Sequence, residues 1–307
     1  MSSSHGRALL HLAAAVDLPS TDDAGSHVEL ARLAETGGLD FVTLDDTFAR
    51  PGPDARPGPD AFDVLSRVAP ATHRIGLVPT VATTHTEPFH VRDAVTALDR
   101  VSRGRAGWRI DVPAGEGEVA EAAAWLWDGV PGSPQGHPVR VVDATEGPAL
   151  PAAARHADVV LVRAADPRQV AAVRDRLRAS AAESGRAPGS LRVLAGLIVD
   201  LGDGEHAAEP GHGGGGPRQT VRGPLYRGGP VDLAELIAAW HADGVADGFH
   251  LTPAEPRRDL ERLVNGTVAL LQHRGLFRTF YPGSTLREHL GLARPARPVR
   301  SGPVWNG

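Results

Sequence analysis

Short apolar segments alternate with longer amphipathic segments along most of the chain. The short segments are rich in Val, Leu and Ile, which is typical of strands buried on both faces of a parallel sheet. The longer segments place Ala, Leu and Arg at helical spacing. The predicted strands are residues 9–16, 41–45, 75–80, 107–112, 139–143, 159–163, 191–199 and 248–251, and the predicted helices are residues 27–36, 61–68, 91–102, 118–127, 149–156, 167–184, 233–243 and 257–274. Eight such alternations favour a (β/α)8 barrel, a TIM barrel, in one domain over residues 1–307.

An open, doubly wound sheet uses the same alternation and is the main alternative. A dinucleotide-binding sheet of that kind places Gly-x-Gly-x-x-Gly after its first strand, and no such motif follows residues 9–16. In a barrel, the functional groups lie at the carboxyl ends of the strands. The positions to inspect are therefore Asp45, Asp46, Thr80 to His85, Arg109, Asp111, Asp143 to Glu146 and Thr252.

Two stretches depart from the alternation. Residues 203–230 are dense in Gly and Pro, so we predict a flexible loop without regular structure, and a lid over the barrel mouth is its functional interpretation. Its His-Gly-Gly-Gly string resembles an esterase oxyanion loop, but no Gly-x-Ser-x-Gly motif accompanies it. Residues 275–307 are predicted to form a C-terminal tail.

Composition and charge exclude several classes of function. The net charge of −5, without clusters of Arg and aromatic residues, argues against nucleic-acid binding. The chain has no Cys and no Lys, which excludes thiolate nucleophiles, cysteine metal sites and lysine Schiff bases. The apolar run at residues 8–16 is too short to span a bilayer and no signal-peptide pattern is present, so we expect a cytoplasmic protein that does not bind a membrane.

His85, Glu87 and His90 are close in sequence and superficially offer ligands for a metal ion. A zinc deaminase would also need Cys ligands, and a barrel hydrolase would carry His-x-His on its first strand, where only His11 occurs. We therefore predict no metal site.

A series of motifs covers nearly the whole chain. They are LDFVTLDD at residues 39–46, RIGLVPTVATTHTEPFHV at 74–91, LDRVSRGRAGW at 98–108, PQGHPV at 134–139, ARHADVV at 154–160, DGVADGF at 243–249, LQHRGLFRT at 271–279 and TLREHLGL at 285–292. In their order and spacing they resemble the bacterial luciferase-like flavin-dependent monooxygenases, and the later motifs resemble the branch that contains nitrilotriacetate and desulfurisation monooxygenases.

The resemblance implies a particular division of labour between protein and cofactor. The barrel would hold FMN at its C-terminal mouth, receive it reduced from a separate flavin reductase, and oxygenate a small organic substrate with O2. The protein would bind the phosphate, position the ring and keep water away.

Four implied site residues follow the second and third predicted strands. Asp46 could accept a hydrogen bond from the flavin ring or the ribityl chain. Thr83 and Thr84 close the third strand, where a hydroxyl suits the edge of the flavin ring. His85 can face the pocket and is the predicted catalytic residue. For Asp46, the alternative role is capping of the following loop, and for Thr83 and Thr84 it is hydrogen bonding to the loop backbone.

Two implied cofactor-binding positions depart from the family pattern. Arg109 stands where many relatives carry an Asn that contacts the flavin, and a guanidinium there can still donate hydrogen bonds or bind an anion. Residues 143–146 replace a turn of small residues that cradles the FMN phosphate, so Thr145 alone is carried over. Glu146 would repel the phosphate unless it turns outward or pairs with an Arg. The segment 113–138 is also shorter than in relatives, which would leave the pocket more open.

Two other functions stay open at this point. The chain could have lost catalysis and bind a flavin, another ligand or a partner subunit, or it could use deazaflavin F420 in place of FMN. Relatives pair through barrel helices, and the second, third and fourth predicted helices could form a homodimer in the same way.

Overall fold

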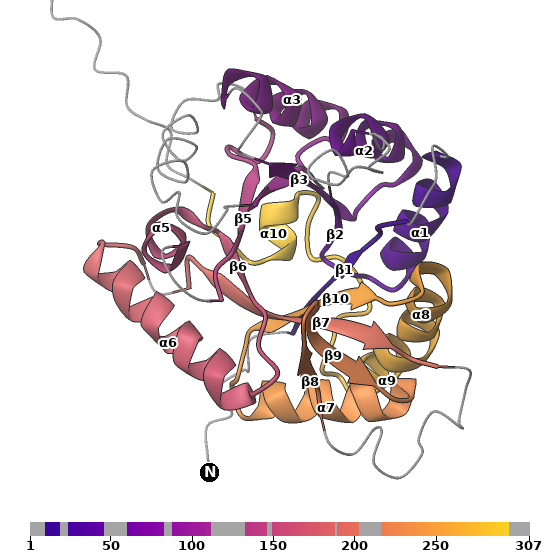
Figure 1. Cartoon of the computed structure of the whole chain (residues 1–307). Coiled ribbons are helices and arrows are strands. Elements are labelled where there is room, and N and C mark those ends of the chain that lie inside the picture. The colour runs from indigo at the N-terminus through magenta and orange to yellow at the C-terminus, as the bar shows by residue number, and fades with distance from the viewer. Residues whose placement is uncertain are drawn as a thin grey trace, which may run out of the picture.

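Eight parallel strands form a closed barrel in the computed structural model, which describes residues 10–18, 24–45, 60–82, 88–111, 133–145, 149–187, 189–202 and 216–294 (Figure 1). The strands of the barrel are β1 (His11–Ala15), β2 (Phe41–Leu44), β3 (Gly76–Ala82), β4 (Gly107–Asp111), β5 (Val139–Asp143), β6 (Val159–Val162), β7 (Arg192–Asp200) and β10 (Gly248–Pro253). The sheet closes because β10 pairs in parallel with both β1 and β7. The predicted barrel is therefore confirmed.

Helices cover the outside of the barrel. They are α1 (Ala24–Thr36), α2 (Ala61–Val68), α3 (Pro88–Val101), α5 (Ala149–His156), α6 (Pro167–Glu183), α7 (Pro230–Ala242), α8 (Pro256–Arg262), a π-helix (Leu263–Val268) and α9 (Ala269–His273), with a 3-10 turn at Ala69–Ala71. In α2, the buried residues recur every three or four positions, which gives one apolar stripe facing the strands. Asp60 caps this helix, because its side chain accepts a hydrogen bond from the Phe62 N–H at 2.7 Å. None of the described helices is both long and apolar enough to cross a membrane.

The register of the strands decides which side chains enter the barrel. Residues that pair across strands point to the same side, and successive residues point to opposite sides. The inward residues Ala13, Phe41, Val78, Val141 and Leu161 pack together, whereas the alternate residues Leu12, Val42, Leu77, Val142 and Val160 pack under the helices. This rule extends to the polar residues at the strand ends.

The short helix α10 (Leu286–His289) fills the amino-terminal end of the barrel (Figure 1). Leu286, Leu290 and Leu292 pack against the inward residues of the strands. Gly76 makes room for this plug, because a Cβ at that position would lie 2.6 Å from a Leu286 methyl group. The plug therefore closes one end of the barrel with apolar groups.

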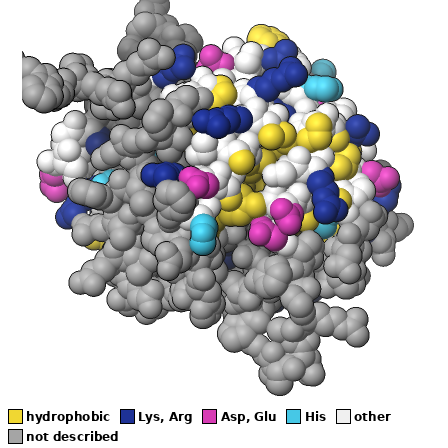
Figure 2. Space-filling model, turned by 90° about the horizontal axis from the view of Figure 1, so that it is seen from above, with side chains coloured by type: hydrophobic (Ala, Val, Ile, Leu, Met, Phe, Trp, Pro, Cys, Tyr) yellow, Lys and Arg dark blue, Asp and Glu magenta, His cyan; other side chains and the backbone are white. Residues whose placement is uncertain are grey.

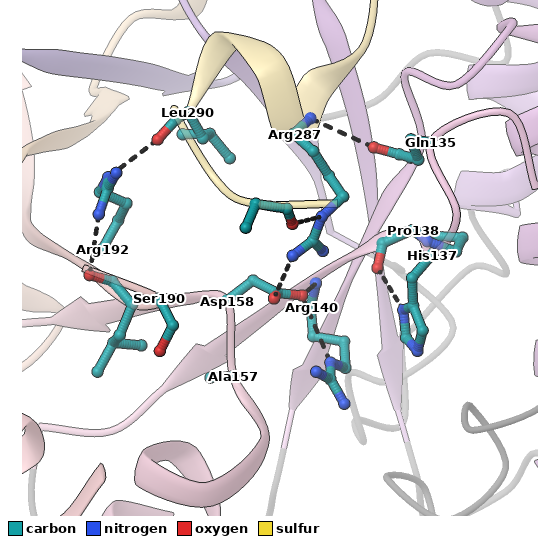
Figure 3. Close-up of polar contacts among 12 residues, drawn as sticks. Gln135, His137, Pro138, Arg140, Ala157, Asp158, Ser190, Arg192, Arg287 and Leu290 are labelled. Carbon is teal, nitrogen blue, oxygen red and sulfur yellow. Dashed lines mark hydrogen bonds and ion pairs between the residues drawn. The ribbon is translucent and has the colours of Figure 1, made fainter. Parts of the chain in front are cut away.

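Polar contacts connect α10 and the segment after it to residues at or near the amino-terminal ends of β5, β6 and β7 (Figure 3). Arg287 donates from Nη2 to Asp158 at 3.1 Å, and its backbone N–H donates to the Gln135 side chain. Arg192 donates to the Leu290 carbonyl at 2.9 Å. Burial alone would raise the pKa of Asp158, but the charges of Arg140 and Arg287 hold that pKa below its usual value. The plug is thus anchored by an ionised, fully paired carboxylate.

One part of the predicted loop 203–230 is regular, and the prediction is wrong there. β8 (Arg218–Thr220) and β9 (Gly223–Arg227) form an antiparallel hairpin, and β9 also pairs in parallel with β7. The hairpin forms because Tyr226 is completely buried and Thr220 closes the turn with a hydrogen bond to the Gly223 carbonyl. Residues 203–215 and the predicted helix 118–127 lie outside the described residues.

Shortening an apolar side chain of the plug should lower the stability of the barrel. We expect Leu286→Ala to lower the free energy of unfolding by about 2–5 kcal/mol, because it leaves a cavity among fully buried neighbours. Urea unfolding followed by circular dichroism measures the effect. The matched control is Val221→Ala, whose side chain is exposed and whose loss should change stability by less than about 0.5 kcal/mol. Equal stabilities of the two variants would show that the plug is not part of the core.

Candidate functional site

Polar side chains gather where the barrel strands end. The inward positions toward the carboxyl ends of the strands, together with the residues that directly follow, include the polar residues Asp45, Thr80, Arg109, Asp143, Arg163 and Thr252. The inward positions at the opposite end are mainly apolar or Gly. The carboxyl-terminal end of the barrel, called the mouth below, therefore carries polar inward side chains, and in barrel enzymes the active site lies at this end.

Asp45, Thr80 and Arg109 form one hydrogen-bonded unit over β2, β3 and β4. The Asp45 carboxylate accepts from the Thr80 hydroxyl at 2.9 Å and from Arg109 Nη1 at 3.0 Å through the same oxygen. The backbone N–H of Asp45 donates to Asp17 at 2.7 Å, which fixes the end of β2. The Arg109 side chain is only 7% exposed, and its Nε is buried without a partner among the described residues. Arg109 therefore has a donor to spare.

Asp143, Thr145 and Arg163 form a second unit over β5 and β6. Arg163 Nε lies 2.7 Å from an Asp143 carboxylate oxygen. The Thr145 hydroxyl accepts from the Arg163 backbone N–H at 2.7 Å and donates to Asp143 at 3.3 Å. These contacts hold the carboxylate and the guanidinium together in one orientation.

His250 lies below both units inside the barrel. Its Nε2 and the Thr43 hydroxyl form a hydrogen bond of 2.9 Å that spans β1. Its two register partners are Ala13 and Gly196, so small residues on both sides leave room for the ring. His250 is thus held at the floor of the mouth.

The electrostatics of the mouth keep His250 neutral. Burial lowers the pKa of His250 well below its ordinary value, and the charges of Arg109 and Arg163 lower it further. Both guanidinium groups therefore exert a positive potential at the floor, although each is paired with an aspartate.

The structure describes two of the six predicted site residues. It places Arg109 at an inward position of β4, and its role in binding a cofactor stays a prediction. It places Thr145 at the rim, where protein groups use both the donor and one acceptor position of its hydroxyl. The predictions for Asp46, Thr83, Thr84 and His85 lie outside the described residues.

Sequence reasoning missed Arg163 and His250. His250 could have been found by the alternation of inward positions, since it stands two residues before Thr252 in the same strand. Arg163 directly follows the apolar strand β6, a position where a charged residue is unusual unless it faces the mouth.

Comparisons with known proteins show the family. The family model described as luciferase-like monooxygenase matches residues 3–122 and 108–283. N-acetyl-S-(2-succino)cysteine monooxygenase of Bacillus subtilis is 25% identical, with 87% of this chain and 89% of the relative covered. Nitrilotriacetate monooxygenase component A of Aminobacter aminovorans is 26% identical, with 90% and 92% covered. The chain therefore belongs to the luciferase-like monooxygenase family, and its enzyme class is that of the oxidoreductases.

Solved structures agree in fold. EDTA monooxygenase from a Chelativorans species superposes with a TM-score of 0.78 at 20% identity, over 93% of this chain and 99% of the other. Two F420-dependent enzymes superpose less closely, with TM-scores of 0.64 and 0.65. The alignment with the Bacillus relative runs over 395 positions, although this chain has 307 residues. That relative therefore carries insertions that this chain lacks.

His250 should make stability depend on pH between 7 and 5. In the folded protein its pKa lies well below 6.5, whereas in the unfolded chain it is about 6.5. The unfolded chain therefore takes up a proton that the folded protein refuses, and stability falls as the pH drops, by at most about 1.4 kcal/mol per pH unit from this group.

We expect His250→Gln, which can keep the hydrogen bond to Thr43, to remove this component. Urea unfolding at pH 7, 6 and 5 gives the free energy of unfolding of the wild type and of the variant. The contribution of His250 is the amount by which the difference between the two free energies changes with pH. His273→Gln, at an exposed position, is the control and should follow the wild type. If the free energies of unfolding of the wild type and His250→Gln depend on pH in the same way, His250 is not buried in its neutral form.

Proposed function

We propose that this protein is a monooxygenase that uses reduced FMN and O2 to oxygenate a small organic molecule, with a separate flavin reductase supplying the cofactor. Family membership and the names of the relatives support the enzyme class. The observation that carries the site assignment is the buried Nε of Arg109, at an inward position of β4, which has no partner among the described residues. Buried donors usually have an acceptor, so this donor at the mouth supports the presence of a ligand acceptor there.

The donors of the mouth fit a reduced flavin. The pyrimidine edge of the flavin ring presents carbonyl oxygens and carries negative charge when the flavin is reduced. A guanidinium near that edge stabilises this charge. The carboxylates of Asp45 and Asp143 are each paired with an arginine, which reduces their repulsion of an anionic ring. The residues present are therefore compatible with FMN.

Within this proposal, each residue of the mouth has a distinct task. When bound, the reduced flavin supplies the electrons for activating O2. Arg109 binds the acceptor edge of the ring, and Asp45 and Thr80 fix the orientation of its guanidinium. His250, being neutral, offers the floor of the mouth a hydrogen-bonding group without adding charge. The role of His85 as the catalytic residue remains part of the proposal.

FMN is preferred to F420 as the cofactor. The relatives aligned over most of this chain are monooxygenases by name, whereas the F420-dependent enzymes resemble it in fold at a lower TM-score.

A second function is favoured by one specific observation. The relative from Bacillus carries insertions absent from this chain. In an enzyme of this kind the residues around the mouth exclude water, so a shorter chain shields the cofactor less. The alternative is therefore a family member that binds flavin or a partner subunit without catalysis.

A homodimer through the face of α2 and α3 belongs to the same proposal. Figure 2 views the molecule from the side that carries these helices in Figure 1 and shows hydrophobic side chains in a band with arginines around it. α3 ends at Val101, whose side chain is 53% exposed. Exposed apolar groups of this kind are typical of symmetric subunit interfaces.

Flavin binding tests the proposed function directly. We expect saturable binding of reduced FMN under anaerobic conditions, and we expect Arg109→Gln to weaken it roughly 10- to 100-fold, because a hydrogen bond from a charged donor is lost. Anaerobic titration followed by flavin absorbance measures the affinity. Arg257→Gln is the matched control, since Arg257 is 70% exposed and lies on α8.

The outcomes separate the two functions. Binding of reduced FMN together with substrate-dependent O2 consumption in the presence of a reductase supports the monooxygenase. Binding without turnover over a broad substrate panel favours the noncatalytic alternative. A folded protein that binds no flavin would overturn both flavin-based assignments.

A further inference from the structure

The guanidinium of Arg163 lies at the barrel mouth, and only some of its N–H groups have partners among the described residues. Its Nε faces Asp143 at 2.7 Å, and its backbone N–H donates to Thr145. Neither Nη atom has a partner among the described residues, and the side chain is 38% exposed. The two Nη groups of this side chain are therefore available to a ligand.

A glycine on the neighbouring strand admits the stem of this side chain. A Cβ on Gly196 would lie 3.1 Å from Arg163 Cγ, which is closer than ordinary van der Waals contact. Gly196 is also the register partner of His250, so the stem of Arg163 lies beside the floor of the mouth and not on the outer surface. The backbone of β7 thus leaves space for an inward cation.

The ion pair with Asp143 orients the guanidinium of Arg163 and leaves its two Nη groups free of Asp143. An ion pair that served stability alone would add little at this exposure. Here, one edge of the guanidinium is fixed and the other is open, which is the geometry that binds an oxyanion through two parallel N–H bonds. Arg109, the second cation, has a buried Nε without a partner among the described residues, so each arginine has a donor that no described residue uses.

We propose that Arg163 is the anchor for an oxyanion group of the ligand bound at the mouth. This inference rests on the proposed function, because the ligand is the cofactor or the substrate of that same site. Two sources carry the required chemistry: the phosphate of FMN and a carboxylate on the organic substrate. Asp143 and Thr145 act as positioning residues for the guanidinium.

Comparison of FMN with riboflavin distinguishes the first source, because riboflavin has the same ring without the phosphate. If the phosphate is the oxyanion, wild-type protein should bind FMN at least about tenfold more tightly than riboflavin, and Arg163→Gln should abolish this preference while keeping the riboflavin affinity. Arg163→Lys, which keeps the charge but loses the planar fork, should retain part of the preference.

Titration with succinate distinguishes the second source. If a substrate carboxylate is the oxyanion, FMN and riboflavin should bind equally, and calorimetry should detect succinate binding to the FMN-loaded wild type but not to loaded Arg163→Gln. Gly196→Ala should weaken the same interaction, since it displaces the arginine stem. Arg257→Gln serves as the control, and circular dichroism verifies that each variant is folded.

Failure of this inference is distinguishable from failure of the proposed function. The inference is overturned when wild type shows neither a preference for FMN nor succinate binding, or when Arg163→Gln preserves whichever of the two the wild type shows. Riboflavin binding that persists in those cases leaves the proposed function standing. Loss of all flavin binding sinks the proposed function, and succinate titration of the flavin-free protein then decides whether Arg163 binds oxyanions.

Discussion

Space inside the closed barrel is the constraint on which the rest of this structure depends. Every second residue of every strand must fit into one narrow interior, so a large side chain from one strand requires a small residue on its neighbour. At the amino-terminal end, Gly76 makes room for Leu286 of the plug. At the mouth, Gly196 makes room for Arg163, and Ala13 lies beside His250. Small residues thus decide where the interior is filled by apolar groups and where by polar ones.

The same interior determines how charge is arranged. Carboxylates and guanidinium groups at the mouth are partly removed from water, so each charge needs a partner close by. Asp45 pairs with Arg109, and Asp143 with Arg163, on different strands of the barrel. Each pair orients its arginine in advance, which lowers the ordering that a ligand must induce when it binds. The pairs therefore act as preorganised donors as well as neutralising partners.

Much of the fold could be predicted from the sequence, because each strand and helix has its own local pattern of apolar residues and this pattern repeats along the chain. The eight strands follow from apolar runs, and their ends agree to within a few residues. The hairpin at 218–227 could not be predicted in this way. Pro and Gly in that stretch indicate a loop, whereas the burial of Tyr226 against β7 and the core arises only after the barrel has closed.

The candidate site was predictable only in part for the same physical reason. The position of Arg109 could be predicted because the family motifs and the strand pattern both point to it. Arg163 and His250 depend on which of two neighbouring residues faces inward, and on small partners in distant strands. Thr145 differs from these two residues, because the sequence did identify its position after β5. Its hydroxyl, however, hydrogen-bonds to Asp143 and to the backbone N–H of Arg163.

Thr145 and Arg163 show how the end of β5 and the end of β6 are joined at the mouth. A turn of small residues can bind an anion through backbone amides, and such a turn needs no charged side chain. Here, β5 ends at the carboxylate of Asp143, and the cation that pairs with it, Arg163, directly follows β6. A carboxylate next to an anion site is tolerable only when a guanidinium lies between the two charges. Under the proposed function, Asp143 and Arg163 act as one unit, because neither charge alone would suit a mouth that receives an anionic ligand.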